Sequence, residues 1–181
     1  MKQIAYVGLG SNLDNPVGQL QQAFQALNGE QTSLESVSDF YVSKPQGPAD
    51  QPDYVNAVAK LRTSLSADAL LRFLQQIEKQ QGKAKKRHWG ERCIDLDLLL
   101  YGEVWQGIFQ SQVIDLPHLQ VPHPMMTQRD FVLLPLQALA PELTLSNGKK
   151  TEPLCYWIER LPERYVYKHF ASQSMGAYFE E

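Results

Sequence analysis

The stretch Arg92-Cys-Ile-Asp-Leu-Asp-Leu-Leu-Leu-Tyr-Gly102 is an apolar run that carries two acids, Asp95 and Asp97, two positions apart. Its aliphatic content and length predict a β-strand. Because side chains alternate between the faces of a strand, the two acids share one face, roughly 6.6 Å apart along the chain. The opposite face is expected to be aliphatic, formed by Ile94, Leu96, Leu98 and Leu100.

Two like charges on a half-buried strand repel each other and lose hydration, so Asp95 and Asp97 require a partner. One such partner is Mg²⁺, a hard cation that prefers oxygen ligands and bridges phosphates. The alternative is a polar edge face whose carboxylates pair with lysine or arginine. The two acids alone leave both interpretations open, because isolated Asp-x-Asp patterns are common.

A basic segment precedes this strand and favours a phosphate site. Residues 83–92 carry a net charge of +4, whereas the whole chain carries −3, so the remainder carries −7. The chain should therefore not bind nucleic acid through bulk charge, but this segment can bind a compact polyanion such as a nucleoside triphosphate. Trp89 in this polar segment is expected to stack on a flat heterocycle. The alternative is a solvated charge run that keeps the surface soluble.

Length and composition predict one globular domain covering residues 1–181. The chain is 43% hydrophobic and 20% charged, which suits a full-sized core. No run is apolar enough to span a bilayer, and the N-terminus lacks the pattern of a signal peptide. Cys93 and Cys155 are far apart and show no CxxC spacing, which favours a reducing cytoplasm. We expect a cytoplasmic monomer without a membrane partner.

Hydrophobic periodicity predicts a β-α-β-β-α-β order. The expected elements are a strand over 4–9, a helix that ends near Gly29, strands over 34–43 and 54–61, a helix over 66–82 and the Asp-bearing strand. This order is typical of an α+β ferredoxin-like sandwich, in which helices pack on an antiparallel sheet. Beyond Gly102 we expect a hairpin over 104–114, at most a broken helix over 127–139 because of Pro135, and a tail over 151–181 that packs on the domain.

Further polar residues are candidates for ligand contacts. Tyr54 and Asn56 share one strand face, where a ring and an amide suit a heterocycle, although ordinary surface residues show the same pattern. His123 and Arg129 either touch phosphate or serve packing and ion pairing. The stretch 8–12 lacks the P-loop and Rossmann patterns, so its small residues predict close packing, with Ser11 or Asn12 holding a neighbouring loop. The four histidines show no zinc spacing.

Several blocks in order resemble one family. They are YVGLGSNL, FYVSKPQGPADQPDYVNAV, IEKQQG, HWGERCIDLDLLLYG and VPHPMMTQRDFVLLPLQALAPEL, which span roughly residues 4–143. This combination resembles the 6-hydroxymethyl-7,8-dihydropterin pyrophosphokinases of folate biosynthesis. The resemblance implies diphosphate transfer from ATP to the pterin hydroxymethyl group with release of AMP. It also implies a ferredoxin-like fold, to which residues 151–181 would be a C-terminal extension.

The resemblance also implies roles for individual residues. Two Mg²⁺ ions would be held by Asp95 and Asp97. The catalytic set would be Asp95, Asp97, Arg92 and Arg87. The pterin pocket would be formed by Ser43, Pro45, Gln46, Tyr54, Asn56, Trp89 and Phe131. ATP would be contacted by Gln75, Glu78, Lys83, Lys85, Arg92, His123 and Arg129, with the basic segment closing over the phosphates.

The basic segment departs from the family pattern. His88 precedes Trp89 where the family usually has arginine, and lysines stand at 83 and 85. Lysine lacks the planar fork with which arginine binds phosphate. These departures motivate an alternative, a non-catalytic paralogue that binds pterin or nucleotide without turnover. A small regulatory domain of ferredoxin-like shape is a third hypothesis, and it leaves Asp95 and Asp97 unexplained.

Overall fold

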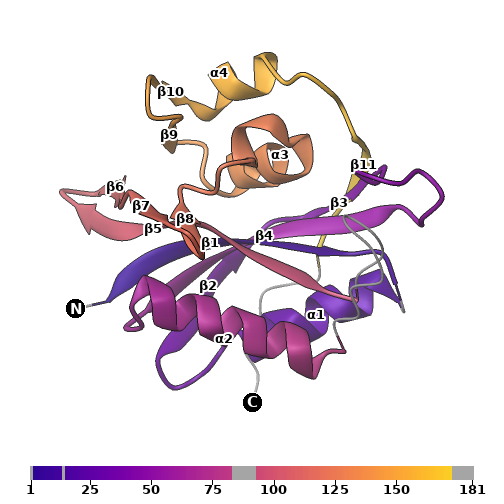
Figure 1. Ribbon diagram of the computed structural model, residues 1–181, viewed down its shortest axis with the longest axis horizontal. Helices are drawn as coiled ribbons and strands as arrows, with labels where there is room; N and C mark the ends of the chain where they lie inside the picture. Colours follow the sequence, from indigo (N-terminus) through magenta and orange to yellow (C-terminus); the bar gives the residue numbers. More distant parts are fainter. Residues whose placement is uncertain (1, 14, 83–92, 173–181) are drawn as a thin grey trace.

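A computed structural model describes residues 2–13, 15–82 and 93–172 of the chain (Figure 1). The central antiparallel sheet has the strand order β11-β3-β4-β1-β5-β6, and β2 also pairs with β4. Its strands are β1 (Gln3–Ser11), β2 (Thr32–Val37), β3 (Phe40–Ser43), β4 (Tyr54–Thr63), β5 (Asp95–Trp105), β6 (Ile108–Ser111) and β11 (Val166–Phe170). The expected mixed fold with an antiparallel sheet and packed helices is therefore confirmed.

Helices cover both faces of the sheet. In Figure 1, α1 (Pro16–Ala26) and α2 (Ala67–Gln80) lie below it, while α3 (Asp130–Leu139) and α4 (Leu154–Glu159) lie above it. We call the α1/α2 side the first face and the α3/α4 side the second face. The remaining elements are β7 (Ile114–Leu116), β8 (Leu119–Val121), the 3₁₀ turn η1 (Met126–Gln128), β9 (Thr144–Ser146) and β10 (Thr151–Pro153).

The first face forms as the sequence predicts. Ser66 caps α2, because its side chain accepts a hydrogen bond from the Ala69 backbone N–H at 3.2 Å. The apolar stripe of α2 is buried through Leu70, Leu74 and Ile77. These side chains join those of α1 and the inward residues of the strands in one cluster. Burial of this cluster stabilises the layer by the hydrophobic effect.

The Asp-bearing strand β5 contains a bulge that changes one expectation. Tyr6 pairs with Leu100 and Val7 pairs with Leu98, so Leu99 is an extra residue between them. As a result, Leu99 and Leu100 both pack in the cluster on the second face, whereas Leu98 stays on the first. The prediction that Leu100 shares a face with Leu98 is therefore wrong, because simple alternation assumes an unbroken ladder.

The predicted strand over 34–43 is in fact two strands, β2 and β3. The chain breaks its ladder at Ser38, whose hydroxyl accepts a hydrogen bond from the Val58 backbone N–H at 2.9 Å. Val37 and Phe40 consequently both pack toward the first face, which continuous alternation would forbid. A serine that bonds the neighbouring strand through its side chain replaces one ladder contact and allows the chain to be redirected.

Helix α3 packs on the second face (Figure 1). Leu133 and Leu136 are fully buried and pack in a cluster with Tyr6 and Leu100. The break that was expected from Pro135 does not occur there, and the helical region is interrupted instead at Arg129, which has extended backbone between η1 and α3. Pro135 lies inside α3 rather than ending it.

Residues 151–172, the described part of the C-terminal segment, pack on the sheet and on its second face. Strand β11 extends the sheet beside β3, and Phe170 meets Phe40 edge-on at 5.4 Å between ring centroids. Helix α4 is anchored by Trp157, whose indole N–H donates to the Leu145 carbonyl at 3.2 Å. No helix in the described ranges has both the length and the apolar character to cross a membrane.

Candidate active site

A cavity opens on the second face, between the sheet and the N-terminal end of α3. Five elements or loops contribute to its lining: β1, β3 with the loop that follows it, β4, β5 and α3 with the preceding residue. The predicted site residues that line it are Ser43, Gln46, Tyr54, Asn56, Asp95, Asp97, Arg129 and Phe131. The structure thus brings together residues that are as much as 88 positions apart in the sequence.

Two glycines of β1 create the room for this cavity. In the β1–β5 ladder Gly8 lies opposite Asp97 and Gly10 lies opposite Asp95. A Cβ atom on Gly10 would lie 3.2 Å from Asn56 Oδ1, closer than a normal carbon contact. Glycine is therefore needed at position 10 for the amide to approach the strand backbone. Both glycines also line the cavity.

The Asn56 side chain is held in one orientation. Its Nδ2 donates to the Tyr41 carbonyl at 3.0 Å and to Ser43 Oγ at 2.9 Å. With both amide hydrogens engaged, Oδ1 is the end that lies against Gly10. Tyr54 lines the same cavity two residues earlier in β4. The strand therefore presents an aromatic ring and an oriented acceptor together, as a heterocycle site requires.

Arg129 lies across the cavity from the sheet, and the charges of Asp95 and Asp97 both act on its guanidinium. Its Nε donates to Gln46 Oε1 at 3.0 Å, and its guanidinium lies 5.7 Å from the centroid of the Phe131 ring. Burial lowers the pKa of Arg129, while the carboxylates of Asp97 and Asp95 raise it. The Arg129 guanidinium is therefore close enough to both acids to interact with their charges. It also contacts Gln46 and Phe131, which are predicted to bind the heterocycle.

A second, more open cavity adjoins the first at Asp97. It is lined by His123 and His118, among other residues, and Asp97 borders both cavities. Nδ1 of His123 accepts the Met125 backbone N–H at 3.2 Å, so a neutral ring carries its proton on Nε2. Burial lowers the pKa of His123, opposed by Asp97, which favours this neutral donor form.

Comparison with known proteins decides the family. The model of the 7,8-dihydro-6-hydroxymethylpterin-pyrophosphokinase family matches residues 6–141. The chain belongs to this pyrophosphokinase family. The 2-amino-4-hydroxy-6-hydroxymethyldihydropteridine pyrophosphokinase of Haemophilus influenzae is 49% identical over 146 residues, which is 80% of this chain and 86% of that protein. The protein of the same name from Pseudomonas aeruginosa is 48% identical over 168 residues, or 90% and 99% of the two chains.

Solved structures agree at the level of the fold. A crystal structure of an HPPK-DHPS in complex with substrates has a TM-score of 0.67 and 13% identity. It is matched by 88% of this chain, which spans 43% of that longer chain. The wild-type HPPK-DHPS of Plasmodium falciparum with SDX-DHP gives a TM-score of 0.65 at 14% identity, with 88% and 44% of the two chains covered.

Some residues implied by the pyrophosphokinase family lie away from the first cavity. Gln75 is exposed and Glu78 is buried on α2, and neither is among the residues that line the two cavities just described. Pro45 is half-buried in the loop after β3, beside the lining residue Lys44. The remaining predicted residues lie outside the described ranges, and these are Lys83, Lys85, Arg87, Trp89 and Arg92.

Two carboxylates of this pyrophosphokinase site could hold a cation. Among the described residues, no three His, Cys, Asp or Glu side chains gather as a metal-holding group. Asp95 and Asp97 nevertheless fit a hard cation, because carboxylate oxygens from one strand face border the same cavity. Phosphate and water oxygens would complete the coordination shell, which is common for magnesium in phosphoryl-transfer enzymes.

Some contributors to the site were not predicted from the sequence as ligand contacts. Lys44 and Val132 line the cavity, and buried Asp130 lies between two lining residues in the chain. No local pattern marks Asp130, because its hydrogen-bond partners are 35 and 36 positions away. One structural expectation is confirmed: Asn12 holds a neighbouring loop by donating to Gln51 Oε1 and the Pro52 carbonyl, each at 3.0 Å.

Proposed function

We propose that this chain transfers diphosphate from ATP to the hydroxymethyl group of 6-hydroxymethyl-7,8-dihydropterin and releases AMP. The observation that carries the proposal is the position of Asp97, which borders both the cavity of Tyr54 and Asn56 and the cavity of His123. A heterocyclic alcohol in the first cavity and a phosphate chain in the second would meet there. Relatives of this name at 48–49% identity favour an active enzyme over a non-catalytic paralogue.

The first cavity supplies recognition of the pterin. Asn56 Oδ1 accepts a hydrogen bond from the N–H edge of the ring, because the other end of the amide is engaged. Tyr54 and Phe131 offer aromatic surface to the flat ring. The oriented amide and the rings place the hydroxymethyl group near Asp97. Ser43 and Gln46 line the same cavity, and we also assign Pro45 and Trp89 to pterin binding on the family resemblance.

The second cavity supplies recognition of the phosphates. His123 donates from Nε2 to a phosphate oxygen, and Arg129 adds positive charge from the adjoining first cavity. We assign the remaining phosphate and nucleotide contacts to the residues implied by the family, namely Gln75, Glu78, Lys83, Lys85, Arg87 and Arg92. Transfers of this kind depend on positioning and charge neutralisation more than on covalent chemistry.

Asp95 and Asp97 would hold two magnesium ions between the cavities. When bound, these ions neutralise phosphate charge and bring the phosphate chain into line. Asp97 also orients the hydroxyl of the pterin and accepts its proton as the oxygen attacks the β-phosphorus. Two carboxylates on one strand face are well suited to this shared role, because a cation relieves their mutual repulsion.

We also infer that the frame has ferredoxin-like topology and acts as one domain. The order β3-β4-β1-β5 with α1 and α2 on one face supports this topology. Strand β11 supports a single domain over residues 1–181, because it completes the same sheet. We propose a cytoplasmic monomer, which size-exclusion chromatography coupled to light scattering would test for its oligomeric state.

The direct test is incubation of the protein with ATP, Mg²⁺ and the hydroxymethyl dihydropterin. We expect one AMP for each diphosphorylated pterin, and little AMP when the pterin is omitted. No AMP above background would contradict the proposal. Calorimetry then separates the alternatives, because tight binding of both ligands without AMP release would identify a non-catalytic binding protein.

A further inference from the structure

The C-terminal segment lies directly behind one wall of the first cavity. We call residues 163–170 the C-terminal brace. Within it, Val166 pairs with Ser43 in the β11–β3 ladder, and the Tyr165 carbonyl accepts the Lys44 backbone N–H at 3.0 Å. Ser43 and Lys44 both line the cavity. The brace is therefore hydrogen-bonded to the backbone of the cavity wall itself.

Tyr165 connects the brace to two further lining residues. Its ring meets the Phe131 ring edge-on, with centroids 5.9 Å apart and an interplanar angle of 73°. Its side chain also interacts with Gln46, and its hydroxyl donates to Glu163 at 2.5 Å. One side chain of the brace thus touches α3 on one side and the loop after β3 on the other. Such aromatic contacts restrict the orientation of both partners.

Asp130 fastens the brace to the start of α3. Its Oδ2 accepts the backbone N–H groups of Tyr165 at 2.7 Å and Val166 at 2.8 Å, and the residue is 1% exposed. Hydrogen bonds to a buried carboxylate are stronger than neutral ones, so this link is stable. In the chain Asp130 lies between Arg129 and Phe131, which both line the cavity. Its position therefore fixes where the first turn of α3 presents the Phe131 ring to the cavity.

A second, weaker link ties the brace to the loop between β3 and β4. Asp53 Oδ2 accepts from the Tyr167 hydroxyl at 2.5 Å and from Lys44 Nζ at 3.3 Å. Lys44 Nζ also lies 5.0 Å from the centroid of the Tyr167 ring. This cluster is largely exposed, so water screens it and it contributes little to stability. It nevertheless joins both ends of the β3–β4 loop to one strand.

We propose that the C-terminal brace positions the heterocycle side of the site, with Asp130 and Tyr165 as its positioning residues. This inference rests on the proposed function. The hydrogen bonds and ring contacts of the brace described above reach Ser43, Lys44, Gln46 and Phe131, which are on the heterocycle side. The brace should therefore govern affinity for the heterocyclic alcohol, with little effect on ATP.

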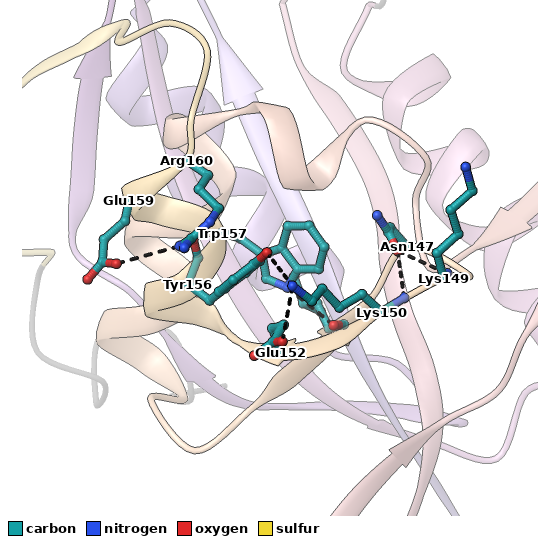
Figure 2. A network of polar contacts seen from close by, with 9 residues as sticks. Asn147, Lys149, Lys150, Glu152, Tyr156, Trp157, Glu159 and Arg160 are labelled. Carbon is teal, nitrogen blue, oxygen red and sulfur yellow. Dashed lines mark hydrogen bonds and ion pairs between the residues drawn. The ribbon is translucent and has the colours of Figure 1, made fainter.

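The matched comparison is Tyr165→Ala against Tyr156→Ala. Figure 2 shows Tyr156 in a network on the α4 side of the molecule, where Lys150 and Arg160 lie over its ring at 4.6 and 3.7 Å from the centroid. Tyr165→Ala should raise the KM for the hydroxymethyl dihydropterin about tenfold, with the KM for ATP and kcat within about twofold. Tyr156→Ala should leave all three unchanged.

Asp130 variants test the same link through a different atom. Asp130→Ala should raise the same KM, because the two N–H groups lose their acceptor. Asp130→Asn should retain most of the affinity, because its side-chain carbonyl still accepts hydrogen bonds. If Asp130→Ala does not fold, the Tyr165 and Asn variants still decide the question. Equal losses in Tyr165→Ala and Tyr156→Ala would overturn the proposal.

A measurement without turnover separates this inference from the proposed function. Hydrogen exchange followed by mass spectrometry reports on the peptide that covers residues 41–53. Tyr165→Ala should exchange faster there than the wild type, whereas Tyr156→Ala should not. If the wild type releases no AMP, the proposed function fails while this comparison still tests the brace. Unchanged exchange in Tyr165→Ala would overturn the brace.

Discussion

The two faces of the central sheet share the same strands but differ in what lies on them. On β1, Val7 and Leu9 point to the first face and are buried under α1 and α2. The alternate residues Gly8 and Gly10 have no side chains to fill the second face, and there the cavity opens. Both faces bury an apolar cluster, but only on the second face do glycines interrupt it and leave room for a ligand site.

The largest expected effect is on the second face, at Asp97. Asp97→Ala should lower kcat about 10³-fold, because it removes the proposed metal ligand and the group proposed to orient the hydroxyl. Affinity for the pterin should change little, and the free energy of unfolding should fall by less than about 1 kcal/mol. AMP release, pterin titration and urea unfolding measure the three quantities. Retained turnover would show that the acids are only structural.

On the first face, Leu74→Ala should lower stability strongly and leave turnover nearly unchanged. Leu74 is fully buried under the sheet, so its truncation should lower the free energy of unfolding by about 2–5 kcal/mol. Turnover per folded molecule should remain within about twofold of the wild type at a temperature where the variant is folded. Urea unfolding and AMP release test this division. A large loss of kcat in the folded variant would show that the two faces are coupled.

A smaller effect is expected at Gly8 and Gly10, which line the cavity on the second face. In Gly10→Ala the new Cβ would lie 3.2 Å from Asn56 Oδ1, so the amide must shift. The KM for the pterin should rise about fivefold to tenfold, with a smaller change in kcat. In Gly8→Ala the nearest atoms are Leu99 methyl carbons at 3.5 Å, an ordinary contact. Steady-state kinetics should therefore show the smaller rise in KM for Gly8→Ala.

The smallest effect concerns the pH dependence of stability. Burial lowers the pKa of His123 below its ordinary value of 6.5, so the unfolded chain binds this proton more readily. The contribution to stability is complete above pH 6.5 and is lost as the pH falls toward the lowered pKa. His123→Gln should flatten this part of the profile. Urea midpoints from about pH 7.5 to about pH 5 should therefore diverge between the two proteins. Parallel profiles would contradict the assignment.

The first face could be predicted from the sequence because its signals are local. The stripe of Leu70, Leu74 and Ile77 and the cap at Ser66 specify α2 without reference to the rest of the chain. The failures were not local in origin. The bulge at Leu99 and the break at Ser38 depend on neighbouring strands, which periodicity within one strand cannot report.

The site was predictable in part because a strand alternates. Asp95 with Asp97, and Tyr54 with Asn56, are pairs that any β-strand places on one face. The juxtaposition of these pairs with Arg129 and the glycines depends on long-range strand pairing. Asp130 could not be found from its sequence neighbourhood, because its role depends on a segment 35 positions away.

We propose that Asp95 and Asp97 hold cations in the cavity that Gly8 and Gly10 of β1 also line. Paramagnetic resonance of Mn²⁺, added with a nonhydrolysable ATP analogue and the pterin, counts the bound ions directly. The wild type should bind two Mn²⁺ per chain in this complex, and Asp97→Ala should bind fewer with weaker affinity. Identical Mn²⁺ titrations for wild type and variant would show that Asp97 does not hold a cation.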